Sequence, residues 1–594
     1  ALPLARMLAD RATQAVYLDR LADADRFATL ADRGLLSGRL GGLTDELRQT
    51  LTIGSVMGLD FLAQVIGRVQ QIPERTLLGN LARELDKRHH LIQEKGETTV
   101  GQQMLSWYRF SHALVQEYLY SDLGEGERRL LHGDVAAALE ELYAGLTDAV
   151  AVQLAYHFLA ARRADKAVHY LTLAGEQAVR AVAYTEASRH FTEALAQLAT
   201  LPETPERTQR ELGLLLSLGA VLTARKGYTD PQVVATYSRM RDLLPKLGQV
   251  PEIFPALMAL ERLYAFGGKG QLQYEVAAQA LDLAESLQDP KLLMGGHQVM
   301  GNALLLKGQF AAARTHFEQS LALYDPQEKY AINLPDDPGV AAGAQLGWTL
   351  WRLGFAEQAL VRSQAALKVA QGFANRPYPE TNALYILALI HFMRRDAPAT
   401  RQTAEAAIAL AVKHGFSYQE AMSRVLYGWA QVEQGEIERG IEQIQRSVAA
   451  LSTINVAGIL APVLAVLASV YGQVDRVDEG LALAAEVQEM GDRPMRMEAD
   501  LYLLQGTLQM KRGDDDQAAE ASLQRAIAIT REQEAKSYEL RATVQLARLW
   551  RAQGKSPKAR QMLADLYGWF SEGFDTVDLR EAKALLDELQ MAGA

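Results

Sequence analysis

One spaced pattern of small residues recurs through the C-terminal three quarters of the chain and constrains its fold more than any other feature. In each copy, a small residue is followed seven positions later by a turn residue and five positions after that by a second small residue. Gly301, Gly308 and Ala313 form one such copy, and the turn positions then recur at intervals of 38 to 46 residues. The predicted turn positions are Gly308, Gly354, Arg395, Gly435, Asp475, Gly513 and Gly554.

The spacing has a direct physical meaning in helices. Seven residues make nearly two helical turns, so the first small residue lies on the same face as the turn. Glycine at the turn gives the backbone the freedom to reverse, and the second small residue then faces the first across two helices that approach closely. Each copy therefore predicts an antiparallel helix pair that must stack on its neighbours to bury its apolar face.

The repeat resembles the tetratricopeptide repeat, whose unit is 34 residues. The longer spacing resembles the extended variety of that repeat in large bacterial regulators. The first interval holds an insertion at residues 325–339, which we predict to be a loop because it is rich in Asp and Pro. Amphipathic segments at 148–162, 164–180 and 185–199 predict further helices at the start of the array.

The first 132 residues follow a different pattern. Residues 2–36 predict two or three helices, and further helical segments follow from Thr44 and around 59–69 and 74–88. Short segments at 90–94 and 106–110, the second alternating and rich in aromatic residues, predict a β-hairpin. Helices are expected again at 113–120 and 127–143.

The predicted fold is all-α. A tetratricopeptide-like superhelix of helical hairpins follows a small winged-helix-like domain with a short β-hairpin. The expected boundaries place a helical remnant of an NTPase-associated region at 1–42, the winged-helix-like domain at 43–132 and the repeat array at 133–594.

Composition narrows the class of protein. Hydrophobic residues make up 49% and charged residues 22%, which is typical of globular chains. The net charge is −11 and no long basic block occurs, so a nucleic-acid partner is not expected. Cysteine is absent, which excludes disulfides and thiolate chemistry and fits a reducing compartment. Without a long apolar run or a signal peptide, we expect a cytoplasmic protein with no membrane partner.

Catalytic motifs are missing from this chain. It has no phosphate-binding Gly-x-x-x-x-Gly-Lys-Ser/Thr loop and no Gly-x-Ser-x-Gly or His-Glu-x-x-His motif. His89 and His90 are adjacent, which is poor geometry for zinc, so no metal site is expected. We expect no enzyme activity and no cofactor in this chain. Because it begins at Ala1, we also expect it to be a fragment whose N-terminal part is missing.

Two regions resemble a known family. Residues 108–120 and 128–132 are similar to the winged-helix region of the signal-transduction ATPases with numerous domains. Residues 337–341, 547–555, 567–576 and 579–586 resemble parts of the adenylate cyclase-linked members of that family, which in bacteria is often fused to adenylate cyclase or protein kinase modules. The resemblance covers roughly residues 43 to 590.

The resemblance implies a regulatory role. Such proteins carry an effector, a P-loop NTPase that holds ADP or ATP, the winged helix and then the repeats as a sensor. This chain would then bind a protein ligand, or a small molecule, and control its own missing NTPase domain and effector.

The resemblance also implies a role for His112. In related ATPases a winged-helix histidine before an apolar helix touches the β-phosphate of ADP, and a helix N-terminus favours such a contact. The alternative is a structural histidine beside Trp107 and Phe110.

Four aromatic residues are candidates for ligand binding. Trp348, Trp351, Tyr378 and Tyr385 lie close together in sequence around one repeat, and could line the concave groove of the array. The alternative is that they belong to its core.

Two other functions fit parts of the sequence. A transcription activator of the maltose-regulator type shares such an array, but it needs a DNA-binding domain after the repeats. A stand-alone scaffold for protein complexes would leave the winged-helix-like module without an NTPase to serve.

Overall fold

The computed structural model describes residues 40–591, apart from 228–229, 249, 327–335, 374–375, 454–456, 491–494 and 514. The helices predicted within residues 2–36 lie outside these ranges. The chain divides into two compact units, one reaching residue 177 and including 192–202, the other comprising 178–191 and 203–594. None of the helices in the described ranges is long and apolar enough to cross a membrane.

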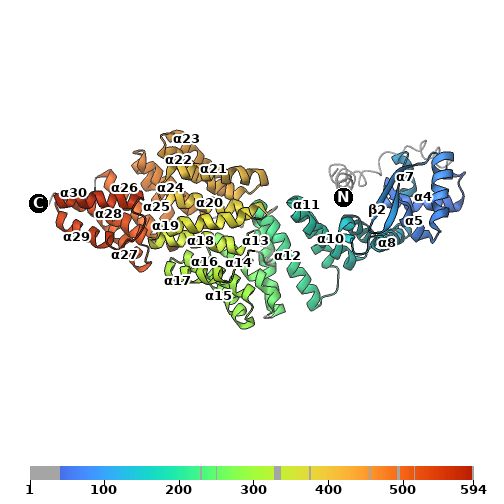
Figure 1. The fold of residues 1–594 in the computed structure, drawn as a ribbon, viewed down its shortest axis with the longest axis horizontal. Helices are drawn as coiled ribbons and strands as arrows, with labels where there is room; N and C mark the ends of the chain where they lie inside the picture. The colour runs from blue at the N-terminus through green and yellow to red at the C-terminus, as the bar shows by residue number, and fades with distance from the viewer. Residues whose placement is uncertain are drawn as a thin grey trace. The chain divides into compact units, whose positions relative to one another are not determined.

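The first unit combines a small sheet with helices (Figure 1). Its strands are antiparallel in the order β1–β3–β2. The elements from the start of the described chain are α4 (Asp45–Met57), β1 (Asp60–Leu62), α5 (Ala63–Gln70), α6 (Glu74–Gly79), the π-helix η2 (Asn80–Arg88), β2 (Ile92–Val100), β3 (Gln103–Phe110), α7 (Ala113–Asp122), α8 (Glu125–Leu142), η3 (Thr147–Val150), α9 (Ala151–Ala160), α10 (Ala164–Arg180) and α11 (Tyr184–Leu198).

The predicted β-hairpin is present and longer than expected. β2 and β3 pair from Ile92 with Phe110 to Val100 with Gln103, with an irregularity before Gly96. The helix expected around residues 59–69 is partly wrong, because residues 60–62 form strand β1 and add to the hairpin. Asp60 pairs in register with Arg109, and their side chains form an ion pair of 2.5 Å. That partner lies 49 residues away, so the local sequence could not reveal the strand.

The second unit is the array of helical hairpins, and the all-α repeat superhelix predicted from the sequence is present. Its main helices are α12 (Pro205–Lys226), α13 (Pro231–Leu247), α14 (Phe254–Phe266), α15 (Gly270–Leu287), α16 (Pro290–Leu306), α17 (Phe310–Ala322), α18 (Pro338–Leu353), α19 (Ala356–Gln371), α20 (Pro377–Met393), α21 (Ala397–His414), α22 (Ser417–Glu433), α23 (Ile437–Thr453), α24 (Ala457–Gln473), α25 (Val477–Glu489), α26 (Glu498–Arg512), α27 (Asp516–Glu532), α28 (Lys536–Ala552), α29 (Ser556–Tyr567) and α30 (Val577–Met591), with short turns η4 (Pro251–Ile253) and η5 (Met495–Met497).

The predicted turns are confirmed by the backbone. All seven turn positions have positive φ, including the non-glycine residues Arg395 at 59° and Asp475 at 60°. The predicted close approach is confirmed too. A Cβ added at Gly428 would lie 2.7 Å from the carbonyl oxygen of Gly440, the second small residue of the same copy. The small residues therefore let the two helices of a hairpin touch backbone to backbone.

The insertion at 325–339 is only partly a loop. Asp337 caps the N-terminus of α18, accepting hydrogen bonds from the backbone N–H groups of Gly339 and Val340 at 3.1 Å each. Pro338 is the first residue of that helix, where its fixed φ suits the first turn. The loop prediction is therefore wrong for residues 338–339, and residues 327–335 lie outside the described ranges.

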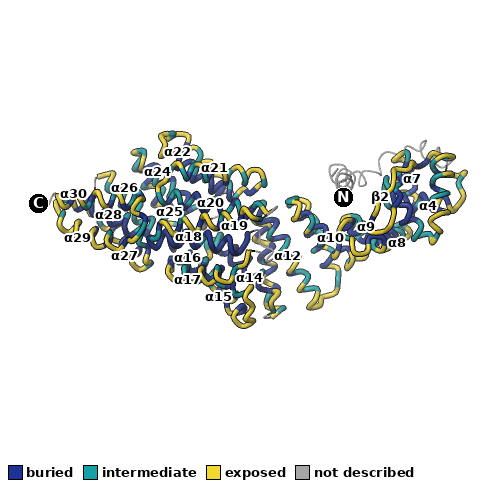
Figure 2. The backbone as a smooth tube through the Cα atoms, in the orientation of Figure 1, coloured by how far each residue is buried: buried dark blue, intermediate teal, exposed yellow. Residues whose placement is uncertain are grey.

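The hairpins of the second unit wind so that one turn meets the next. The first helix of a hairpin touches the first helix five hairpins further along, as α12 does with α22, α14 with α24 and α18 with α28. Figure 2 shows buried and exposed stretches alternating along these helices. The first helices thus face the inside of the superhelix, where they form the walls of a groove.

Candidate functional site

The inside of the superhelix holds a cavity of about 530 Å³. Every first helix from α14 to α28 contributes side chains to its wall. One position recurs in all seven copies of the repeat: the residue directly after the first small residue lines the cavity. These residues are Asn302, Trp348, Leu389, Trp429, Ser469, Thr507 and Arg548.

Three of the four predicted aromatic residues line this cavity. Trp348 projects from α18, and Tyr378 and Tyr385 project from α20. Tyr385 is 8% exposed, and burial raises the pKa of its hydroxyl to about 12. The structure therefore brings these three together, while their role as ligand contacts stays a prediction.

Trp351 faces elsewhere. It is 2% exposed and packs edge-on against Tyr538 of α28, with ring centroids 5.4 Å apart. Its backbone carbonyl accepts a hydrogen bond of 2.5 Å from the hydroxyl of Ser537. Trp351 thus joins two successive turns of the superhelix.

His112 lies in the first unit, at the N-cap of α7. Its side chain is exposed and makes no capping hydrogen bond. The exposed side chain does not suit the alternative of a structural histidine packed beside Trp107 and Phe110, whereas its predicted contact with a nucleotide in another domain stays a prediction.

Two buried arginines stand side by side in the cavity wall. Arg352 is 2% exposed and binds Asp500 with both terminal nitrogens, at 3.1 and 2.8 Å. Arg496 is 8% exposed, and its guanidinium lies 4.5 Å from the ring centre of Trp348. Burial and the neighbouring Arg352 lower the pKa of Arg496 to about 10. Both guanidinium groups therefore stay charged at neutral pH, and the charge of one carboxylate, Asp500, acts on both of them.

Several buried polar atoms of this wall have no hydrogen-bond partner within the described part of the chain. They are Trp348 Nε1, Arg352 Nε, Arg496 Nε, Gln298 Oε1 and Gln345 Oε1. A buried polar group without a partner costs about 1–3 kcal/mol, and more when it is charged. A bound molecule that supplied these partners would recover that free energy.

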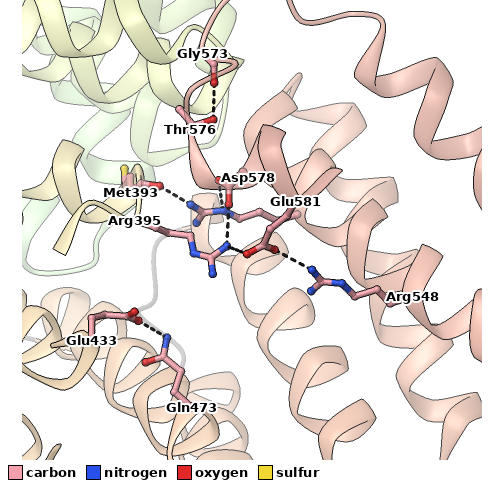
Figure 3. A network of polar contacts seen from close by, with 10 residues as sticks. Met393, Arg395, Glu433, Gln473, Arg548, Gly573, Thr576, Asp578 and Glu581 are labelled. Carbon is pink, nitrogen blue, oxygen red and sulfur yellow. Dashed lines mark hydrogen bonds and ion pairs between the residues drawn. The ribbon is translucent and has the colours of Figure 1, made fainter. Parts of the chain in front are cut away.

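A network of ion pairs forms part of the cavity wall (Figure 3). Arg395 reaches Asp578 at 3.5 Å and Glu581 at 2.8 Å, although about 180 residues separate them in sequence. Arg541 binds Asp578 at 2.8 Å, and Arg548 binds Glu581 at 3.0 Å. The network therefore ties α28 and α30 to the turn after α20.

The cavity wall also carries a buried carboxyl group, that of Asp336. Asp336 is 3% exposed, and burial raises the pKa of its side chain to about 6. It accepts a hydrogen bond of 2.7 Å from Asn382 and lies 3.7 Å from the guanidinium of Arg262. Asp336 belongs to the segment predicted as a loop, so the sequence analysis missed it as a wall residue.

No family model matches the chain. An uncharacterized protein of Rhizobium meliloti (strain 1021) is 20% identical over 445 residues, which cover 73% of this chain and 43% of that protein. The chain thus spans less than half the length of this curated relative.

The similar solved structures are helical repeat proteins. A Rap protein complexed with competence and sporulation factor is 14% identical, with a TM-score of 0.43 over 66% of this chain and 99% of that one. A signal transduction ATPase with numerous domains from Pyrococcus horikoshii, with a tetratricopeptide repeat sensor, is 11% identical, with a TM-score of 0.35 over 86% of this chain and 68% of that one. These similarities concern the repeat fold alone.

Proposed function

We propose that the second unit is the ligand-sensing array of a signalling protein, and that its groove binds a peptide or small molecule. The observation that carries the proposal is the cavity of about 530 Å³ with its unsatisfied buried polar atoms. That volume lies within the range of sites that enclose small ligands. Aromatic walls with a few fixed polar groups are the composition such sites share.

Through the contacts between successive turns of the array, a bound ligand would control the conformation of the array. Successive turns meet through polar contacts such as the Ser537–Trp351 hydrogen bond and the pairs of Arg395 with Asp578 and Glu581. A ligand that touches several first helices at once changes the free energy of opening or closing these contacts. A sensor must bind its ligand with different affinities in its two conformations, here with these contacts open or closed.

The first unit would transmit the signal in this proposal. Its three-stranded sheet and helices suit the winged-helix-like module expected from the sequence, and His112 stands exposed at the start of α7. The controlled partner would be a nucleotide-binding domain of the same parent protein, with an effector beyond it.

The proposal is tested by asking whether the cavity retains a ligand. The purified chain is equilibrated with the low-molecular-weight fraction of a bacterial extract, washed and analysed by native mass spectrometry. A Ser469→Trp variant fills the cavity from α24, and Val361→Trp is the matched control because Val361 is 62% exposed and lies outside the cavity wall.

We expect the wild type and Val361→Trp to retain the same compound and Ser469→Trp to lose it. Retention of nothing, or equal retention by Ser469→Trp, contradicts the proposal.

A further inference from the structure

We propose that the groove recognises its ligand by an anionic oxygen group, a carboxylate or a phosphate, which docks on Arg496 beside Trp348. This inference rests on the proposed function and names the chemistry of the ligand. Five buried polar atoms of the groove wall have no partner among the described residues, and a ligand in the groove could supply one.

Arg496 has no ion-pair partner among the described residues. It is 8% exposed, and its Nε atom forms no hydrogen bond with them. Buried charges in proteins are paired, because an isolated charge is costly to remove from water. Asp500, a carboxylate whose charge acts on Arg496, is already bound by both terminal nitrogens of Arg352. Among the described residues, the wall therefore offers no carboxylate that pairs with Arg496 alone.

The described part of the cavity wall is positively charged. Among the described residues it contains six arginines and four carboxylates, an excess of two positive charges in a chain of net charge −11. The arginines are Arg262, Arg352, Arg395, Arg496, Arg541 and Arg548, and the carboxylates are Asp336, Asp500, Asp578 and Glu581. A positive hollow in a negative protein concentrates the potential on small anions and excludes cations.

Two further buried donors of this wall have no partner among the described residues. They are the indole N–H of Trp348, over whose ring Arg496 lies, and Arg352 Nε. A guanidinium fork is the protein group best matched to carboxylate and phosphate oxygens. The unfilled acceptors Gln298 and Gln345 lie in the same wall and suit the hydroxyl or amide groups of the rest of the ligand.

The test uses simple anions as probes. Sodium acetate and sodium phosphate are titrated at constant ionic strength, with sodium chloride as the reference salt. Binding is followed by tryptophan fluorescence and by the shift in Tm. Stabilisation by acetate identifies a carboxylate site and stabilisation by phosphate a phosphate site; either supports the proposal.

Arg496→Gln is the test variant and Arg439→Gln its control. Arg439 lies on α23 outside the cavity wall, with a side chain 80% exposed. We expect Arg496→Gln to lower the affinity for the probe anion by about tenfold or more, because the substitution removes a charge-assisted contact. Arg439→Gln should bind as the wild type does.

The Tm of Arg496→Gln without added anion shows whether the variant folds. Arg496→Gln removes an unpaired buried charge, so its Tm without added anion should equal or exceed that of the wild type, which shows that it folds. The inference is overturned if neither anion acts more strongly than chloride, or if Arg496→Gln responds as the wild type does. If a neutral ligand is retained in a manner that Ser469→Trp abolishes, the proposed function stands and the anionic class alone is wrong.

Discussion

Replacing Gly428 with alanine tests the close approach on which the whole array depends. The added Cβ would lie 2.7 Å from the Gly440 carbonyl oxygen, 2.9 Å from Ile444 Cγ1 and 3.2 Å from Gln443 Cβ. The first of these atoms belongs to the backbone, so the two helices must separate. Overpacking of this kind costs about 1–3 kcal/mol.

The expected loss of stability in Gly428→Ala is smaller than the overpacking cost alone, because alanine itself favours the helix. Alanine is better than glycine in a helix by about 0.5–1 kcal/mol, which offsets part of that cost. Gly213 isolates this gain, because it lies in helix α12 with no atom within 4 Å of an added Cβ. We therefore expect Gly213→Ala to raise the free energy of unfolding and Gly428→Ala to lower it.

The assay is urea denaturation followed by far-ultraviolet circular dichroism. The predicted result is a lower midpoint for Gly428→Ala and a slightly higher midpoint for Gly213→Ala. If both variants gain stability equally, the helices of the hairpin do not touch at Gly428, and the packing argument is refuted.

Three further predictions concern titratable groups. Burial raises the pKa of Glu261 from its ordinary 4.5 to about 7, so the free energy of unfolding falls as pH rises through that window. Glu261→Gln should abolish the fall and stabilise the protein at pH 8 by up to about 3 kcal/mol, measured by denaturation at pH 5 and pH 8. In the first unit, burial lowers the pKa of His132 from 6.5 to about 4 and of His157 well below its usual value, and their Nδ1 atoms lie 2.8 Å apart. The free energy of unfolding of this unit should have its full value above pH 6.5 and fall as pH drops below it. If the protection factors of the backbone amides in α8 and α9 are the same at pH 7 and pH 5, the reasoning is wrong. In a protein that includes the NTPase domain, His112→Ala should lower ADP retention, measured on the purified protein, and unchanged retention would exclude the nucleotide contact.

The repeat pattern predicted the hairpins because each hairpin is a local structure. Spacing of seven and five residues fixes where the small residues meet, and the turns need positive φ wherever they fall in the chain. Even Arg395 and Asp475, which are not glycines, adopt that conformation. Such features depend on neighbours in sequence, so the sequence reveals them.

The cavity wall depends instead on how the hairpins wind. Trp348 and Trp351 are three residues apart on α18, yet one lines the cavity and the other joins two turns of the superhelix. Arg352 and Asp500 are 148 residues apart and meet through that winding. The position directly after each first small residue was a usable signal, because it lines the cavity in every copy, but its direction becomes clear only once the curvature is known.

The central claim is that the groove of the second unit binds a ligand, and hydrogen exchange of the intact chain tests it most directly. Exchange is compared with and without the compound that the chain retains from the low-molecular-weight fraction of the extract. The account predicts slower exchange in the first helices that form the wall, above all α18, α20 and α26, and unchanged exchange in α19, α21 and α27. Slower exchange confined to α19, α21 and α27, or no change in any helix, would contradict it.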